Sequence, residues 1–572
     1  MLQGKALIDA IRKNDISKVR KYIQSADNLN YSYEKNGWQS LHYAASLGYK
    51  TLAMELINKD SNLVNAKDSD GNTPLHLAAA HGKGDVIELF LSKQASIDKV
   101  GKNNWTPLHY AVYENRLPVV KFLIEKGANI DATGLSGETP LQLAVEKGDS
   151  HMELAKLLRS RELFNAMKGD NLGDDINKIK GLFVNEIDVN YSDLNNWTPL
   201  HYAAHNGYTK AAEFLVEKKA NVNVRTDSRE KPLHIAAKNG YKDIVEFFID
   251  QQGLSINEQG ENKWTPLHYA AASNSLNVVQ YLVEEKEAAI DTKDRNNWTA
   301  LHHASKEGHI EIVKFLIKKG ANINAHNSQG KLPVDLASES KVIQFLLSEG
   351  LFNAVRENKV LEVTNYLNKE VNGTRVEVDY RDHNNGTSLH HAARHGYLNI
   401  VEPLVEHEAN VNATDINKWT PLHHASEDGN LGVITFLVDN QADIHAENVD
   451  KDKPLHIAVK NGHQPIVRFF VNKQSMDVND RGKDDWTPLH YASANNYSQI
   501  VSFLVKEGAN ITIQSAQGKT PLELVSGNQE IVRSLQNKAL LDALEQGEYT
   551  QVQRYLDSGA DPNSLSENDW TL

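Results

Sequence analysis

Apolar residues recur along the chain in a pattern that predicts two short amphipathic helices in every 33 or 34 residues. In "DRNNWTALHHASKEGHIEIVKFLIKKGANINA", which begins at Asp294, Leu301 and Ala304 form a narrow apolar face. The later segment "IEIVKFLIKKG" carries a wider face, formed by Ile312, Val313, Phe315, Leu316 and Ile317. This spacing predicts a first helix with a narrow buried face and a second helix with a wide one. A polar link, "GANIN" in this repeat, leads to the next pair.

Residues suited to helix ends flank each first helix. Thr299 directly precedes one of them and can cap its N-terminus. The helix is expected to end at a residue with positive φ, which is glycine at Gly48, Gly82, Gly148, Gly207, Gly240, Gly308, Gly396, Gly429 and Gly462. Three repeats have Asn115, Asn274 and Asn496 there, and asparagine is the next-best residue for that role. One helix pair cannot bury its wide face alone, so neighbouring pairs are expected to stack into a solenoid.

The residue just before each first helix marks the repeats. It stands at Gln39, Thr73, Thr106, Thr139, Thr198, Lys231, Thr265, Thr299, Leu332, Thr387, Thr420, Lys453, Thr487, Thr520 and Thr571. Three gaps are wider than 33 or 34 residues, and each holds a further helix pair without the usual opening turn, such as "GLFNAVRENKVLEVTNYLN". We therefore expect a mainly α-helical solenoid of stacked helix pairs with short β-hairpins and about 17 to 18 repeats.

A longer period groups the repeats into modules. Similar segments start at Leu7, Leu163, Leu351 and Leu540. We predict three modules, at residues 1–162, 163–350 and 351–537, and the start of a truncated fourth at 538–572, where the sequence stops within a motif at "NDWTL". At each boundary a second helix runs almost directly into the next first helix. We expect a bend or narrowed stacking there, with a merely shortened hairpin as the alternative.

The stretches "NNWTPLHYA" and "GHIEIVKFLIKKGANINA" resemble the ankyrin repeat, and the match covers nearly the whole chain. The resemblance implies a curved solenoid whose concave groove, lined by hairpins and first helices, binds a protein. Similar long arrays in intracellular bacteria serve as host-directed effectors, which would place the chain in the host cytoplasm after secretion. The alternative is the ankyrin portion of a larger toxin or enzyme whose active domain lies outside this chain.

Composition narrows the possible partners. The net charge is −14 and acidic and basic residues are interspersed, without the clustered Lys and Arg that nucleic acids or anionic membranes attract. The absence of cysteine excludes disulfides, thiolate metal ligands and cysteine nucleophiles within this chain. No apolar run approaches the length of a membrane span. We expect a cytoplasmic protein with a protein partner, and no nucleic acid, membrane span or small-molecule substrate.

Histidine is the strongest candidate for chemistry, with 24 copies. Eleven of them, from His42 to His490, stand at the motif's own histidine position, where the resemblance implies hydrogen bonds between neighbouring repeats. The doublets His302-His303, His390-His391 and His423-His424 suggest metal binding. The second histidine of each doublet stands where Trp-bearing repeats have tyrosine, so packing is the favoured interpretation. Because no zinc-protease helix, serine-hydrolase elbow or dinucleotide fingerprint occurs, we expect no enzyme activity, cofactor or metal.

All eight tryptophans, from Trp38 to Trp570, directly precede a first helix. The resemblance places this position on the inner limb of a hairpin, at the rim of the groove. Each ring can pack on its own repeat, contact a partner, or do both, because tryptophan is enriched in binding hot spots. Trp264 and Trp298 are expected to form a close pair. The predicted partner-binding residues are Trp38, Trp105, Trp197, Trp264, Trp298, Trp419 and Trp486 with His205, Lys238, Lys306, Arg394, Glu427 and Lys460 on the first helices.

Overall fold

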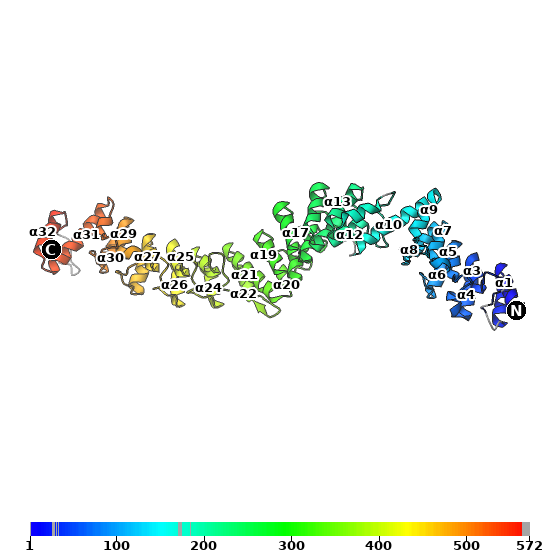
Figure 1. The fold of residues 1–572 in the computed structure, drawn as a ribbon. Helices are drawn as coiled ribbons and strands as arrows, with labels where there is room; N and C mark the ends of the chain where they lie inside the picture. Colours follow the sequence, from blue (N-terminus) through cyan, green and yellow to red (C-terminus); the bar gives the residue numbers. More distant parts are fainter. Residues whose placement is uncertain are drawn as a thin grey trace. The chain divides into compact units, whose positions relative to one another are not determined.

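The computed structural model describes residues 2–25, 29, 31–32, 34–169, 174–183 and 185–562. Trp570, Thr571 and the end of the predicted fourth module lie outside the described residues. The chain divides into two units, Met1–Ala304 with Lys318–Gly320, and Ser305–Ile317 with Ala321–Leu572. In each unit, helix pairs follow one another in sequence order (Figure 1). The predicted mainly helical solenoid of stacked helix pairs is confirmed.

The first helices are short and stack on one another within each unit. They are α3 (Ser40–Leu47), α5 (Pro74–Ala80), α7 (Pro107–Tyr113), α9 (Pro140–Glu146), α12 (Pro199–Asn206), α14 (Pro232–Asn239), α16 (Pro266–Ala272), α18 (Ala300–Lys306), α20 (Pro333–Leu336), α23 (Ser388–Arg394), α25 (Pro421–Asp428), α27 (Pro454–Lys460) and α29 (Pro488–Ala494). Every glycine and asparagine predicted to follow a first helix has positive φ, for example 78° at Gly207 and 54° at Asn115. The predicted helix ends are therefore confirmed.

The second helices form the other layer. They are α4 (Lys50–Lys59), α6 (Gly84–Ser92), α8 (Leu117–Glu125), α13 (Thr209–Glu217), α15 (Lys242–Glu246), α17 (Leu276–Gln280), α19 (Ile310–Lys318), α24 (Leu398–Glu406), α26 (Leu431–Asp439), α28 (Gln464–Arg468) and α30 (Ser498–Lys506). A first pair, α1 (Leu2–Arg12) and α2 (Ile16–Ser25), precedes them. Short 3-10 turns, η1 (Ser61–Asn65), η2 (Lys102–Asn104), η3 (Gly148–His151), η5 (Glu261–Lys263), η8 (Lys483–Asp485) and η9 (Leu522–Leu524), complete the connections.

The longer repeats contain an extra residue that the second helix absorbs. The repeats that open at Lys231, Thr265 and Lys453 are 34 residues long. In each of them the second helix ends in a π-helical turn, which is η4 (Phe247–Gln251), η6 (Tyr281–Glu285) or η7 (Phe469–Lys473). A π turn bonds each residue to the fifth one along instead of the fourth, so it holds one more residue. The insertion therefore widens a helix without lengthening the stack.

At the three predicted module boundaries a second helix and the next first helix join into one helix of 17 residues. These boundary helices are α10 (Met152–Lys168), α21 (Ser340–Arg356) and α31 (Gln529–Glu545), and they are followed by α11 (Ile176–Leu182), α22 (Val360–Asn368) and α32 (Tyr549–Asp557). Because a helix does not reverse, the chain there continues in one direction instead of folding back. A buried core that includes Leu7 reaches Leu158, midway along α10. The module bounds and the bends stay predictions.

We call the segment between a second helix and the next first helix a finger. The fingers are tight turns that bond to one another. The N–H of Asp294 donates to the carbonyl of Trp298 at 2.9 Å, which closes one turn. The N–H of Ile416 donates to the carbonyl of Asn384, in the preceding finger, at 2.9 Å. Within the described ranges the assigned strands are β1 (Glu370–Val371) and β2 (Thr374–Arg375), which pair antiparallel after α22.

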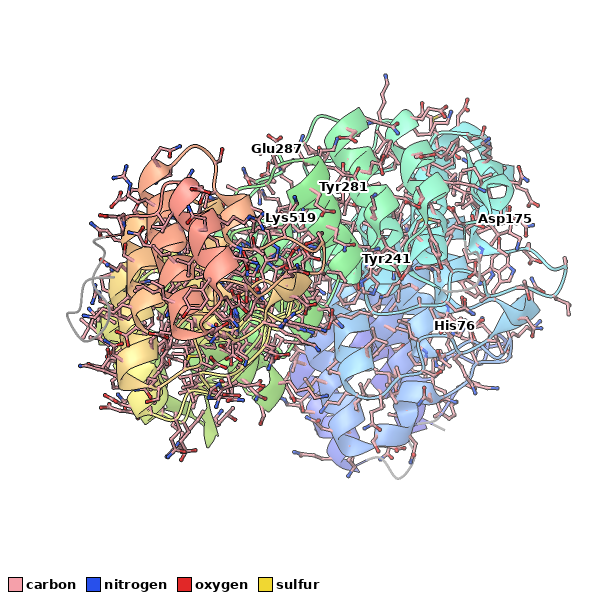
Figure 2. The ribbon with its side chains drawn as sticks, turned by 90° about the vertical axis from the view of Figure 1, so that its left-hand side faces the viewer. His76, Asp175, Tyr241, Tyr281, Glu287 and Lys519 are labelled. Carbon is pink, nitrogen blue, oxygen red and sulfur yellow. The ribbon has the colours of Figure 1, made fainter. Side chains whose placement is uncertain are left out.

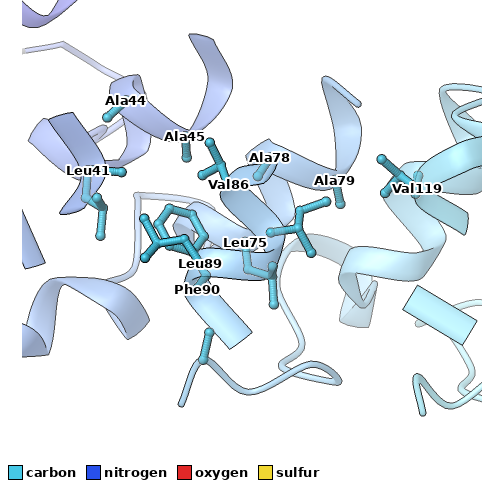
Figure 3. Packing of buried hydrophobic residues seen from close by; sticks show 14 of the residues in the cluster. Leu41, Ala44, Ala45, Leu75, Ala78, Ala79, Val86, Leu89, Phe90 and Val119 are labelled. Carbon is cyan, nitrogen blue, oxygen red and sulfur yellow. The ribbon is translucent and has the colours of Figure 1, made fainter. Parts of the chain in front are cut away.

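The buried core lies between the two helix layers and between successive pairs. Leu75, Ala78 and Ala79 of α5 face the preceding α3 and the following α7, while Phe90 of α6 fills the space between layers (Figure 3). All four side chains are fully buried. Alanine at these first-helix positions allows the close approach of adjacent repeats, and the large apolar residues come from the second helices.

One residue near the end of each finger turn has positive φ, and in several repeats it is a long side chain. Lys418 has φ 58° and is exposed. Replacing it with glycine removes the steric cost of the left-handed conformation, so Lys418→Gly is expected to raise the free energy of unfolding by about 1 kcal/mol. Urea unfolding measures this change. Lys314→Gly, at an exposed position inside α19, is the control and should lower stability by a similar amount; a loss at both positions would contradict the turn geometry.

Candidate functional site

The motif histidines connect each first helix to the finger that follows it. In ten of them Nε2 lies 3.0–3.4 Å from a backbone carbonyl of that finger; they are His42, His76, His109, His201, His234, His268, His390, His423, His456 and His490. For His76, labelled in Figure 2, the acceptor is the carbonyl of Trp105 at 3.1 Å. The backbone N–H of Thr73 donates to Nδ1 of the same ring at 3.0 Å.

These contacts fix the protonation state of the rings. A carbonyl oxygen only accepts and a backbone N–H only donates, so the proton must sit on Nε2 and Nδ1 must be unprotonated. Burial lowers the pKa of all ten rings, and it lowers the pKa to about 4 for His76, His201, His234, His268 and His423. The neutral rings act as structural bridges between repeats and use both of their nitrogens. They are poorly placed for catalysis.

The repeats that precede the boundary helices replace this histidine. Gln142, Asp335 and Glu523 stand in its position, and a side-chain oxygen of each accepts the N–H of the residue before the first helix at 2.7–2.9 Å. No ordinary finger follows these repeats, so an imidazole Nε2–H would have no carbonyl to reach. An acceptor alone is sufficient there. The sequence carries this signal in the residue type, although the spacing of the repeats alone does not reveal it.

Two repeats replace the usual threonine with lysine. The Nζ of Lys231 lies 2.9 Å from Oε1 of Glu258, and the Nζ of Lys453 lies 2.9 Å from Oδ2 of Asp480. Both acids belong to the finger that follows, and the Lys231 side chain is 8% exposed. These ion pairs provide a second bridge between a first helix and the next finger, beside the bridges from His234 and His456.

All seven described tryptophans are partly buried and pack on their own first helix. Trp486 lies with its ring centroid 6.1 Å from His490 and 5.0 Å from Tyr491. The other six make similar contacts, with ring centroids 4.9–5.4 Å from the residue at the Tyr491 position. The described structure therefore shows the self-packing contact, while part of each ring remains accessible. Contact with a partner stays a prediction.

Trp264 and Trp298 are joined by a third ring. The centroid of His303 lies 4.2 Å from Trp264 and 4.9 Å from Trp298, and its Nε2 lies 3.1 Å from Oδ2 of Asp294. The predicted pair is thus a three-ring cluster on two neighbouring repeats. His303 is 6% exposed, so it supports the two indoles from below.

The histidine doublets show packing and no metal geometry. The second ring bonds a finger carboxylate in each case: His303 with Asp294, His391 with Asp382 and His424 with Asp415, at 3.1–3.3 Å. Tyr202 makes the equivalent bond to Asp193 at 3.2 Å, so histidine takes the place of tyrosine. Within the described ranges no group of three or more His, Cys, Asp or Glu side chains is placed to hold a metal ion.

The predicted first-helix residues lie at the last turns of their helices, beside the tryptophans. His205, Lys238, Lys306, Arg394 and Lys460 are exposed and Glu427 is partly buried. His205 packs edge-on to Trp197 at 5.7 Å, and Arg394 approaches Glu427 of the next repeat at 3.7 Å. We call the surface formed by these residues and the tryptophans the finger face. It carries both charges and runs along successive repeats within each unit.

The opposite surface, made by the second helices, is dominated by ion pairs. Around Tyr281, labelled in Figure 2, Lys242 pairs with Glu285 at 2.9 Å and Lys286 with Asp250 at 2.6 Å. Both lysine ammonium groups also lie within 5.5 Å of the Tyr281 ring centroid. Charges paired in this way within the chain are less available to a partner, which favours the finger face as the binding surface.

The fold and this surface define a helical repeat solenoid without a recognisable catalytic centre in the described residues. A family model for ankyrin repeats (three copies) matches residues 7–100, 90–168, 163–259, 233–327, 286–355, 351–448, 433–515 and 455–542. The chain therefore belongs to the ankyrin-repeat family. In the part of the chain that the structure describes, no helix is both long enough and apolar enough to cross a membrane.

Similarity to curated proteins is limited to short stretches. The chain is 32% identical over 99 residues to protein phosphatase 1 regulatory subunit 12A of Mus musculus, which is 17% of this chain and 10% of that protein. It is 32% identical over 92 residues to ankyrin repeat and SAM domain-containing protein 6 of Mus musculus, 15% and 10% of the two chains. It is 40% identical over 67 residues to transient receptor potential cation channel subfamily A member 1 of Homo sapiens, 11% and 6%.

Proposed function

We propose that this chain is a non-enzymatic scaffold that holds a protein partner along the finger face. The observation that supports the proposal most is the row of partly buried indoles, each fixed on its own first helix. A ring held in one orientation loses little conformational freedom when a partner covers its remaining surface, which favours binding. Exposed side chains of both charges beside the rings suit an extended protein segment better than a small substrate.

Host-directed effector activity is a finer proposal within this one. It rests on the resemblance of the "NNWTPLHYA" repeats to arrays of intracellular bacteria, which makes a host protein the expected partner and the host cytoplasm the expected compartment. The curated relatives named above come from mouse and human and support only the repeat family. The alternative stays the repeat portion of a larger toxin or enzyme.

Charge reversal on one face at a time tests the scaffold proposal. Lys238→Glu with Lys460→Glu changes the finger face, one position in each unit, and Lys210→Glu with Lys506→Glu changes two exposed second-helix positions by the same net charge. Affinity purification from a host-cell lysate is expected to lose its partner with the first pair only. Equal recovery with both pairs, or loss with the second alone, would contradict binding at the finger face.

Truncation of the central indoles gives an independent test. Trp264→Ala with Trp298→Ala is expected to reduce partner recovery by at least about tenfold, since buried aromatic anchors in hot spots contribute about 2 kcal/mol or more. The free energy of unfolding must be measured beside it, because both rings also support His303. Unchanged recovery by a folded variant would remove this pair from the binding surface.

A further inference from the structure

The tryptophan position of one repeat holds glycine. Gly386 directly precedes Thr387, and its N–H donates to Oδ1 of Asp382 at 2.8 Å. Trp298 and Trp419 make the same bond to Asp294 and Asp415 at 2.9 Å, so this backbone geometry accommodates a tryptophan. Gly386 is not among the residues with positive φ. The backbone therefore does not require glycine here, and the consequence of glycine is an empty space.

A cavity of about 290 Å³ opens at this point on the finger face. Its lining includes Gly386, His390, His391 and Arg394 of one repeat and Ile416 and His424 of the next. Ile416 is 62% exposed at the tip of its finger, which gives the mouth of the cavity an apolar edge. All of these residues belong to the second unit.

A repeat pair in the first unit shows what fits such a cavity. There Trp264 lies 6.4 Å from His268, 5.2 Å from Tyr269 and 4.2 Å from His303. The residues at the corresponding positions of the second unit are His390, His391 and His424, which are the three rings that line the cavity. The His268–His303 and His390–His424 centroids are both 5.6 Å apart, with interplanar angles of 85° and 78°. The walls are thus preserved, and the central indole is missing.

The cavity also offers an unused hydrogen-bond acceptor. The Nε2 of His424 lies 3.1 Å from Oδ2 of Asp415, which only accepts, so Nε2 carries the proton of the neutral ring. Nδ1 is then an acceptor, and it is buried without a hydrogen-bond partner. The nearest carboxylate oxygen, Oε2 of Glu427, is 4.0 Å away, beyond hydrogen-bond range. An indole N–H could satisfy this nitrogen, whereas an aliphatic side chain could not.

Other positions without tryptophan are occupied by the chain itself. Asn72 accepts a hydrogen bond from Tyr110 at 2.8 Å, Asp452 accepts one from Tyr491 at 2.7 Å, and Glu138 accepts one from Trp105 at 2.5 Å. Gly386 has no side chain to serve in this way. We propose that the cavity at Gly386 receives one aromatic side chain, best matched by tryptophan, from the protein partner. This inference rests on the proposed scaffold function and adds the side-chain class that the finger face recognises.

N-acetyl-L-tryptophanamide is the probe that tests the cavity directly. Titration into the full chain, followed by saturation-transfer NMR, is expected to show saturable binding, with weaker binding of N-acetyl-L-leucinamide and N-acetyl-L-argininamide. Gly386→Trp places an indole in the cavity and is expected to weaken binding of the probe by at least about tenfold. Lys519→Trp, which adds a tryptophan at the same position of another repeat, is the control and should bind like the wild type.

Three results would overturn the proposal: no saturable binding, equal binding by Gly386→Trp, or a preference for the arginine probe. Gly386→Leu, which fills the cavity only in part, serves if the tryptophan variant does not fold, and it should also weaken binding. Failure of the scaffold proposal is distinguishable. If Lys238→Glu with Lys460→Glu removes the partner but Gly386→Trp retains it, the finger face binds and the proposed role of the cavity is wrong.

Discussion

Acidification from neutral pH to about pH 4 is expected to destabilise the array strongly, because the buried histidines must become charged. Burial lowers the pKa of five rings from the ordinary histidine value of 6.5 to about 4. Between these two values the unfolded chain binds more protons than the folded one, so stability falls as the pH falls. The contribution is complete above pH 6.5 and is lost by about pH 4. Each ring accounts for roughly 3 kcal/mol.

Urea unfolding at a series of pH values measures this loss, and His201→Gln isolates one ring. The chain already uses Gln142 in the histidine position, where Oε1 accepts the N–H of Thr139. At neutral pH the variant is expected to lose about 1 kcal/mol, since the bond to the carbonyl of Glu230 becomes imperfect. Its stability difference between neutral and acid conditions should shrink by roughly 2 to 3 kcal/mol. A pH profile identical to that of the wild type would contradict the bridging role.

Phe248→Ala is expected to lower the free energy of unfolding by about 3 to 5 kcal/mol, the usual result of deleting a fully buried ring. The side chain of Phe248 is fully buried in the π turn that ends its second helix. Because each repeat contacts only its neighbours, the damage should remain local. Hydrogen exchange measured by mass spectrometry should show faster exchange in the repeats that begin at Thr198, Lys231 and Thr265, and unchanged exchange near Thr487.

Phe122→Ala is the matched control, since Phe122 stands one position earlier in its own second helix and is only partly buried. A loss of about 1 kcal/mol is expected there, in proportion to the smaller apolar area removed from contact. Uniformly faster exchange along the whole chain in Phe248→Ala would show that the array unfolds as one cooperative unit.

The helix pairs could be predicted from the sequence because local chemistry specifies them. A threonine before the first helix, glycine or asparagine after it and a wide apolar face on the second helix each determine a local structure, and the helix ends were confirmed at Gly207 and Asn115. The boundary helices could be predicted only in outline. Nothing in the spacing shows that α10 is continuous, although Gln142, in place of histidine, marks a repeat that no ordinary finger follows.

The candidate site was predicted as a set of positions and not as a shape. The sequence placed the tryptophans in one row, but their contacts depend on neighbouring repeats, as in the stacking of Trp264 on His303. The cavity at Gly386 is a clearer case. A glycine in that position has no meaning until His390, His391 and His424 are seen to form the walls. Absent side chains leave no signal in a search for chemical motifs.

Site-specific photo-crosslinking tests the central claim, that a protein partner binds at the finger face. A benzoylphenylalanine residue is placed at Lys238 or Lys460 on the first helices, and at Lys210 or Lys506 on the second helices, all of which are exposed. Irradiation in a host-cell lysate is expected to give the same discrete protein adduct from both first-helix positions and none from the second-helix positions. Adducts of equal yield from the second helices, or no adduct from any position, would contradict the account.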